Sequence, residues 1–387
     1  LRQMFFSTGL KGIKQEDRDK VEKLILDTLE KLGNKPLPED LVEAGLNTIE
    51  FQLRENNTGN FPRGLSLMLR SLTTWLYDND PFALLAFETP LQKIRQAAKN
   101  DSMFFSSLIQ RFLLNNGHRI SLLLAPDTGM AERIAAEEAE ELAGVKTAMS
   151  PEEIEQTIAQ TKRLHELQEK PDAPEDLARI PRLHPSDLAK EIKKTPEEQS
   201  DIEGVPVYVH PLSCNGIVYL DLAFRLDGFS LEEMSFTAIL GKALLEMGTD
   251  KFDYSELGTR ISRFTGGIRS KAMVHSLAES DRALSLQLLK CRVTAGRIPK
   301  LIEILGDILG STNLADKDRF RQIVLERKAS LEAALVPRGH SYVSSRLQAT
   351  LNASGRIGDA QSGIAYLQFL RKLLEKIDED WNAVQQK

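Results

Sequence analysis

The sequence predicts an α+β fold with two domains, each an antiparallel-rich sheet covered by helices, joined by a helical-hairpin linker. Residues 1–127 combine helical spacing with two short strand-like segments, and residues 128–200 are rich in charge and proline. From residue 201 the predicted order is strand, helix, helix, strand, strand, helix, helix, which is typical of one sheet covered by helices. We therefore divide the chain into residues 1–127, 128–200 and 201–387.

The first of these regions is predicted to hold helices between two strands. Residues 4–13 alternate as a strand does, and residues 120–127 form a short apolar run bounded by turn residues. Because a strand needs neighbours and the sequence around residues 4–13 is helical, we interpret this domain as truncated. Helical spacing covers residues 15–32, 38–55, 63–77, 90–98 and 103–114. The side chains expected inward in the second and third of these helices are Leu41, Leu46, Ile49, Leu53, Leu65, Leu69, Leu72 and Leu76.

Composition changes abruptly at about residue 128. Two segments rich in Ala and Glu carry narrow apolar stripes and are joined by AGVKTAMS, which predicts an antiparallel helical hairpin. The prolines at 171, 174, 181 and 185 then exclude regular structure. Residues 128–200 are therefore interpreted as a linker between domains.

The third region is predicted to hold most of a domain in which helices cover one sheet. Its strands are expected at residues 205–212, 216–229, 268–277 and 285–293. Its helices are expected at residues 231–247, 254–264, 298–309, 317–335, 339–351 and 362–384.

Composition limits the classes of partner. A hydrophobic content of 41% with 27% charged residues is ordinary for a soluble protein. The formal net charge of −6 predicts neither a nucleic-acid nor a membrane partner. No apolar run approaches the roughly 18 residues that a membrane helix needs, and two cysteines suit a reducing compartment.

One segment is far more specific than composition. Residues 46–81, LNTIEFQLRENNTGNFPRGLSLMLRSLTTWLYDNDP, resemble the presequence-protease branch of the pitrilysin/insulinase-type zinc metallopeptidases. The resemblance continues through FSTGLKGI, HRISLLLAPD, VYLDLAFRLDGFSLEEMSFTAILGKALLEMGT and RGHSYVSSRLQATLNASGRIGDAQSGIAYLQFLRKL, and so covers essentially the whole chain. Such enzymes have four related domains in two halves that close around a peptide. The resemblance implies the C-terminal part of the second, non-catalytic domain (1–127), the linker (128–200) and the third domain (201–387).

The family's zinc site is not found in this sequence. The resemblance implies zinc held in the first domain by an inverted HxxEH motif and a downstream Glu, with the motif's Glu as general base. This sequence contains no His-x-x-Glu-His. If Gly248-Thr249 is aligned with the Gly-Thr or Gly-Ser that follows the motif, the two His positions become Ile239 and Ala243, and the base becomes Lys242. The third domain therefore resembles a degenerate copy of the catalytic one, and we predict no catalytic or metal-binding residue in this chain. The family's fourth domain contributes an Arg and a Tyr, in a stretch like R-x-x-G-G-A-Y-G, which is also missing here.

Several other patterns have a structural explanation that we prefer. His165 and Glu169 share a helix face, but a charged linker helix is ordinarily solvated. His210 and Cys214 are four apart, yet Pro211 interrupts regular spacing and a strand-end turn explains them. Cys291 is expected to be a small buried hydrophobe. The glycines at 228, 248, 266 and 267 lack a phosphate-binding context and are expected in turns and caps.

The loop at residues 54–63 is the one candidate binding segment. Its polar density exceeds what a turn needs, so peptide contact or chamber lining competes with a structural turn whose Asn side chains satisfy backbone groups. The predicted substrate-binding residues are Arg54, Asn57, Asn60 and Arg63.

Together these observations predict a non-catalytic middle segment, chamber wall and hinge, of a zinc metallo-endopeptidase that degrades unstructured peptides. Zinc is expected in the full-length parent and not in this segment, which should be inactive alone. One alternative is a metal-free scaffold or assembly subunit of the same fold, and another is an unrelated helical adaptor. Expected partners are peptide substrates, the remaining parent domains and a second copy at the truncated sheet edge. The expected location is the cytoplasm of a bacterium, or the mitochondrial matrix or plastid of a eukaryote.

Overall fold

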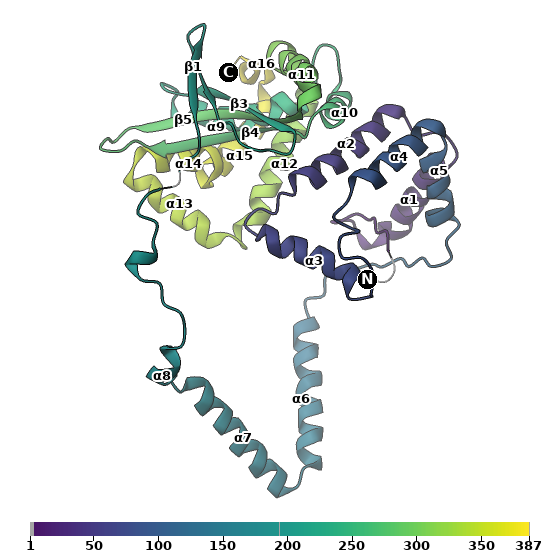
Figure 1. The fold of residues 1–387 in the computed structure, drawn as a ribbon, viewed down its shortest axis with the longest axis vertical. Helices are drawn as coiled ribbons and strands as arrows, with labels where there is room; N and C mark the ends of the chain where they lie inside the picture. The colour runs from purple at the N-terminus through teal and green to yellow at the C-terminus, as the bar shows by residue number, and fades with distance from the viewer. Residues whose placement is uncertain (1–3, 193, 387) are drawn as a thin grey trace. The chain divides into compact units, whose positions relative to one another are not determined.

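The computed structural model describes residues 4–192 and 194–386, which form helices and two small antiparallel sheets (Figure 1). The predicted α+β class is confirmed. Contacts within the chain divide the protein into two compact units, which we describe separately. The described part of the first unit comprises residues 4–7, 26–116 and 213–386, and that of the second comprises residues 8–25, 117–192 and 194–212. These units do not follow the three-part division of the sequence, which stays a prediction based on the resemblance.

The sheet of the first unit has three strands in the order β3-β5-β4, with both pairs antiparallel. Leu220 on β3 and Ile268 on β4 both pair with Cys291 on β5, so Cys291 lies at the centre of the sheet. Leu289, Cys291 and Val293 are buried, as alternation along a half-buried strand requires. The strands are β3 (Ile217–Arg225), β4 (Ile268–Ser276) and β5 (Ala283–Thr294).

Helices follow strands β3 and β5 in this unit. The starts of two of them are set by capping boxes, Ser230 with Glu233 and Asp253 with Glu256. The helices are α9 (Leu231–Glu246), α10 (Tyr254–Phe264), α11 (Ile298–Ser311), α12 (Lys317–Leu335), α13 (Gly339–Leu351), α14 (Ala353–Ser362), α15 (Ile364–Glu379) and α16 (Trp381–Gln385). The sequence did not predict α14, and the single helix expected at residues 362–384 is two helices separated at Asp380.

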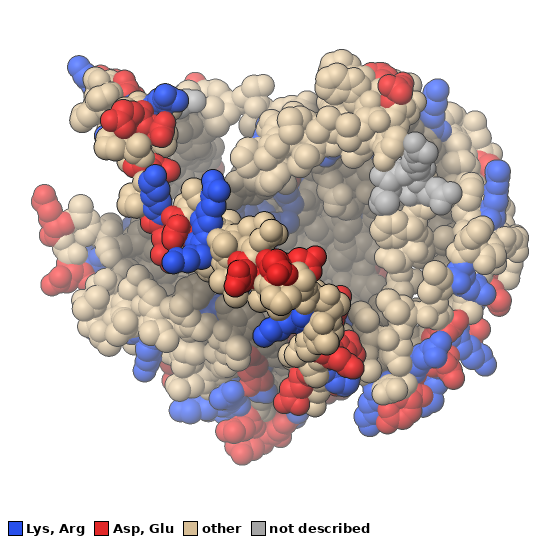
Figure 2. All heavy atoms as spheres, turned by 90° about the horizontal axis from the view of Figure 1, so that it is seen from below, with Lys and Arg blue, Asp and Glu red and all other residues tan. Residues whose placement is uncertain are grey.

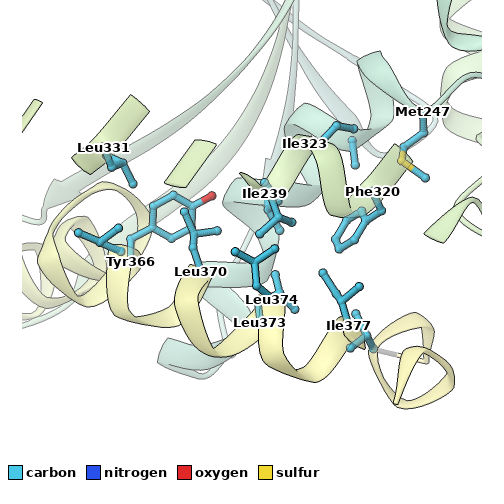
Figure 3. Close-up of a cluster of buried hydrophobic side chains, with 14 residues drawn as sticks. Ile239, Met247, Phe320, Ile323, Leu331, Tyr366, Leu370, Leu373, Leu374 and Ile377 are labelled. Carbon is cyan, nitrogen blue, oxygen red and sulfur yellow. The ribbon is translucent and has the colours of Figure 1, made fainter. Parts of the chain in front are cut away.

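Two hydrophobic clusters hold the unit together. One gathers side chains from α9, α12, α15 and α16, including Ile239, Ile323 and Leu370 (Figure 3). The other lies between the sheet and helices α10 and α11, around Leu257 and Ile304. Close packing of this kind is the main source of stability in such a domain.

The helices predicted in the N-terminal region are present, but the inner faces of two differ from the expectation. The buried side chains of α2 are Ala44, Asn47 and Phe51, whereas Leu41 is 50% and Ile49 49% exposed. In α3 no residue is buried. The elements are α1 (Arg18–Gly33, in the first unit from residue 26), α2 (Glu39–Glu55), α3 (Arg63–Trp75), α4 (Glu88–Asn100) and α5 (Phe104–Ile109), followed by a π-helical turn (Gln110–Leu114).

Both strands predicted in the N-terminal region are wrong. Residues 4–13 and 120–127 pair with no strand among the described residues. Ile120 is 91% and Leu124 84% exposed. Alternation specifies a strand only where a neighbouring strand supplies hydrogen-bond partners, and the truncated sheet that we expected is therefore not formed here.

The second unit contains the linker helices. Helices α6 (Met130–Ala148) and α7 (Pro151–Glu169) form as predicted, and Ser150 with Glu153 caps α7. Neither has a buried side chain, and they diverge from their turn in place of the expected side-by-side hairpin packing (Figure 1). A narrow apolar stripe offers too little surface for two helices to pack along their length. A short helix, α8 (Pro174–Leu177), and a 3-10 turn (Pro185–Asp187) follow.

The second unit also contains a hairpin that the sequence predicted only in part. Strand β2 (Val205–Val209) falls in a predicted strand, but β1 (Glu198–Ile202) crosses the predicted end of the linker at residue 200 and was missed. The two-residue turn between them places Glu203 at φ 53° and Gly204 at φ 84°. Positive φ at both central residues is the turn geometry that suits a tight hairpin.

The surface is of mixed charge. On the face drawn in Figure 2, basic and acidic side chains lie in small interspersed groups, as on a solvated surface. Among the described residues, no helix is long and apolar enough to cross a membrane.

Candidate functional site

The two positions that the resemblance assigns to zinc-binding histidines lie on the buried face of α9. Ile239 is 1% exposed and Ala243 is fully buried, both in the cluster that includes Tyr366 and Leu370 (Figure 3). Neither side chain carries an atom that can bind a metal ion. Lys242 forms ion pairs with Glu246 at 3.6 Å and Glu326 at 3.4 Å. These residues do not fit a zinc ion, and we derive no hydrolytic step through them.

The histidines and cysteines singled out in the sequence occupy ordinary structural environments. The His210 ring bonds through Nδ1 to the carbonyl oxygen of Pro196 at 2.9 Å. Cys291 is 1% exposed, as predicted, and burial raises the pKa of its thiol to about 11. Within residues 4–192 and 194–386, no group of three or more His, Cys, Asp or Glu side chains could hold a metal ion.

A buried hydrogen-bond network around Asn47 joins α2 to α10 in the first unit. The side-chain amide of Asn47 donates to the carbonyl oxygens of Ser262 and Thr265, both at 2.8 Å. Its oxygen accepts a 2.6 Å bond from Nη1 of Arg297. Arg297 also donates to the carbonyl oxygen of Arg263 at 2.7 Å. Asn47 is 2% exposed. These hydrogen bonds therefore replace the hydrogen bonds to water that its side-chain amide loses on burial.

Ion pairs flank this amide at both ends of α2. Near the N-terminal end, Arg263 pairs with Glu43 at 2.5 Å and also with Asp40. Near the C-terminal end, Arg292 pairs with Glu55 at 2.5 Å, and the Tyr219 hydroxyl donates to the same carboxylate at 3.2 Å. Helix α2 is therefore fixed along its whole length to the sheet and helices of residues 213–386.

Phe51 completes the contact. A methyl group built on Gly266 would lie 2.3 Å from the Phe51 ring, so only glycine leaves room for this approach. Ala44 and Phe51 are both buried, which makes the contact apolar on either side of the Asn47 amide.

Beside this contact is a cavity of about 400 Å³ that we name the arginine cavity. Its charged lining residues are Glu50 and Arg54 of α2, Arg95 of α4, and Arg297 before α11. Glu50 accepts from Arg54 at 2.8 Å and from Arg95 at 2.6 Å, one at each carboxylate oxygen. Burial alone raises the pKa of Glu50, but the hydrogen bonds and charges of the two arginines outweigh it and lower the pKa below its usual range. Glu50 is thus ionised at neutral pH.

The structure places only one of the four predicted substrate-binding residues at this cavity. Arg54 lines it, whereas Arg63 donates to the carbonyl oxygen of Glu55 at 3.0 Å. Asn57 accepts from the Gly59 amide at 3.0 Å, and Asn60 is exposed. Arg63 and Asn57 thus support the local turn. Sequence reasoning missed Arg95 and Arg297, which lie far from Arg54 in the chain and carry no motif.

The structure defines an α+β class of fold, in which a three-stranded antiparallel sheet is packed against helices. Residues 124–373 match the family model for the region associated with peptidases of family M16, subfamily C, and the chain belongs to this family. It corresponds to the middle region of the presequence-protease branch of the M16 peptidases.

Relatives with similar sequences agree with this assignment. The chain is 39% identical over 386 residues to presequence protease 1, chloroplastic/mitochondrial, of Arabidopsis thaliana, covering 99% of this chain and 36% of that protein. It is 31% identical to Protein HypA of Clostridium perfringens, covering 98% of this chain and 39% of that protein. It is 24% identical to the mitochondrial presequence protease of Danio rerio, covering 97% of this chain and 36% of that protein. The chain thus spans well under half the length of these relatives.

Proposed function

We propose that this chain is the non-catalytic middle segment of a zinc metallo-endopeptidase that degrades unstructured peptides. The observation that carries the proposal is the burial of Ile239 and Ala243 in the hydrophobic cluster formed by α9, α12, α15 and α16, with Lys242 in ion pairs beside them. Side chains that stabilise a core cannot also hold a metal ion and a catalytic water. The zinc ligands and the general base are expected elsewhere in the parent protein.

The proposed role of the segment is to form chamber wall and hinge. Helices α6 and α7, which contain no buried side chain, suit a connection that moves. The contact between α2 and residues 213–386 suits a rigid wall, and Arg54, Asn57, Asn60 and Arg63 are proposed to face the peptide chamber.

The remaining domains of the parent are the proposed partner for the apolar face of α3. Leu65 is 39% and Leu69 48% exposed, and Leu76 directly after the helix is 72% exposed. Exposed apolar side chains in such a row mark a surface that another part of the protein covers. The names of the relatives place them in mitochondria, chloroplasts or a bacterium. We propose a bacterial cytoplasmic location or a mitochondrial or plastid one, which fractionation with compartment markers tests.

A test uses the full-length protein. We expect bound zinc by metal analysis, cleavage of a fluorogenic unstructured peptide, and loss of both on chelation. Lys242→Gln should leave zinc content and kcat unchanged, because Lys242 lies outside the active site. Loss of zinc or turnover in that variant, with its melting temperature unchanged, would contradict the assignment of α9. A full-length protein without zinc or turnover would instead favour the metal-free scaffold.

We also propose the self-association expected at the truncated sheet edge, through residues 4–13 and 120–127. Neither segment pairs with a strand that the structure describes, and we propose that their backbone groups pair with a second copy. Light scattering coupled to gel filtration should show a dimer fraction that grows with concentration, and a strict monomer at high concentration would contradict this.

A further inference from the structure

The arginine cavity holds an excess of positive charge. Its lining includes three guanidinium groups and one carboxylate, that of Glu50. Arg54 and Arg95 share this carboxylate. Arg297 bonds to the neutral oxygens of Asn47 and Arg263, and it forms no ion pair with a carboxylate among the described residues. The charged lining therefore has two more positive than negative charges, and one of its cations, Arg297, lies against the buried amide of Asn47.

The guanidinium groups also keep hydrogen-bond donors for another molecule. Each has five N–H groups. Of these, Arg54 uses Nε and Arg95 uses Nη2 toward Glu50, and Arg297 uses Nη1. The other nitrogen atoms of these three side chains bond to no residue that the structure describes, and they are the donors that a second oxyanion can accept from.

The three groups are held in place before any ligand binds. The Glu50 carboxylate orients two of them, one through each oxygen. Arg297 is held by Asn47, which is itself fixed by Ser262 and Thr265. Asn215 also lines the cavity, and its side chain donates to the carbonyl oxygen of Arg54 at 3.1 Å, which links this part of the lining to α2. Donors that are positioned in advance lose little entropy on binding.

We propose that the arginine cavity binds an oxyanion, either a carboxylate of a peptide or free phosphate. Planar guanidinium groups match the paired oxygen atoms of both ligands. A volume of about 400 Å³ accommodates either group with part of the molecule that carries it. The inference goes beyond the proposed function and stands on the cavity alone, since its test measures binding and not hydrolysis.

The experiment is calorimetric titration of the full chain with three probes at low ionic strength. The probes are inorganic phosphate, a short peptide with a free C-terminal carboxylate, and the same peptide with a C-terminal amide. We compare the unmodified chain with Arg95→Gln, Arg297→Gln and the control Arg321→Gln. Arg95→Gln leaves Glu50 paired with Arg54 and should fold normally. Arg321 pairs with Asp378 on the surface and does not line the cavity.

We expect saturable binding of phosphate, of the peptide acid, or of both, with no binding of the peptide amide. Binding of the peptide acid identifies a peptide carboxylate as the ligand, and binding of phosphate alone identifies a free oxyanion. Removing one charge-assisted contact should weaken binding by about tenfold or more in Arg95→Gln and Arg297→Gln, but not in Arg321→Gln. Absence of saturable binding, or affinity unchanged in a folded Arg95→Gln variant, would overturn the proposal.

Discussion

Arg297 donates a 2.6 Å hydrogen bond from Nη1 to the side-chain oxygen of Asn47, although 250 positions separate them in the chain. The bond links the start of α11 to the middle of α2. With the ion pairs at each end of the helix, it makes α2 a part of the unit formed by residues 213–386. A helix that the resemblance assigns to the preceding domain is therefore bonded firmly to the next one.

Asn47→Ala should destabilise the first unit. The substitution leaves the carbonyl oxygens of Ser262 and Thr265 and the Arg297 donor without this partner. We expect a loss of about 2 kcal/mol or more in the free energy of unfolding, measured by urea denaturation. Asn60→Ala is the matched control, because Asn60 is exposed and its loss should change stability by less than about 0.5 kcal/mol. Equal stabilities of the two variants would show that the Asn47 bonds do not stabilise the docked helix.

Gly266→Ala should weaken the contact between Phe51 and the sheet. The added methyl group would lie 2.3 Å from the Phe51 ring, so the ring or the backbone must move. Overpacking of this kind costs about 1–3 kcal/mol. The control is Gly258→Ala in α10, where nothing lies within 4 Å of the new atom and helix propensity should raise stability by up to about 1 kcal/mol. Thermal unfolding should shift in opposite directions for the two variants, and a shared direction would contradict the packing described.

Glu50 should contribute stability that depends on pH. Its pKa in the folded chain is lowered by Arg54 and Arg95 against the opposing effect of burial. The Glu50 carboxylate therefore takes up a proton at higher pH in the unfolded chain than in the folded one. Its contribution to the free energy of unfolding is complete above the unfolded pKa of about 4.3, and it is lost as pH falls through the pKa of the folded chain. The difference in unfolding free energy between the unmodified chain and Glu50→Gln should be larger near pH 6 than near pH 3.

The quantity that reports on Glu50 is the difference in unfolding free energy between the unmodified chain and Glu50→Gln. Arg133, Arg371 and Arg321 likewise lower the pKa values of Asp127, Glu332 and Asp378 respectively, and these effects are present in both. A difference that does not change with pH would contradict the bonding of Glu50.

The two cysteines should differ in reactivity. Burial, with a smaller effect of Asp221, raises the pKa of Cys291 to about 11. At about pH 8 only on the order of one thiol in a thousand is then the reactive thiolate. Cys214 is partly exposed. Mass spectrometry after iodoacetamide treatment should show labelling of Cys214 first, and of both in denaturant. Equal labelling rates in the native chain would contradict the central position of Cys291 in the sheet.

The sequence predicted those parts of the fold that carry strong local signals. Ser230 with Glu233 and Asp253 with Glu256 mark helix starts, and all three strands of the larger sheet were predicted. Strand β1 was missed because EQSDI is polar and exposed, and it forms only through pairing with β2. The segments at residues 4–13 and 120–127 failed for the opposite reason, since their apolar alternation has no partner among the described residues.

The site was less predictable than the fold. Hydrophobicity indicated that Leu41 and Ile49 face inward on α2, whereas the buried face is centred on Asn47. A polar residue becomes a packing centre only when distant groups satisfy it, and Arg297 and the Ser262 carbonyl oxygen cannot be inferred from local spacing. For the same reason the sequence did not predict the arginine cavity, and Arg54 is the one predicted substrate-binding residue that lines it.

The central claim is that this segment contributes structure and not chemistry to a peptidase. The most direct measurement is zinc content and cleavage of a fluorogenic peptide by the purified 387-residue chain after dialysis, with the full-length protein as positive control. The proposed function predicts less than stoichiometric zinc and no cleavage by the chain alone, while the full-length protein cleaves the same peptide. One tightly held zinc ion per chain together with turnover would contradict it.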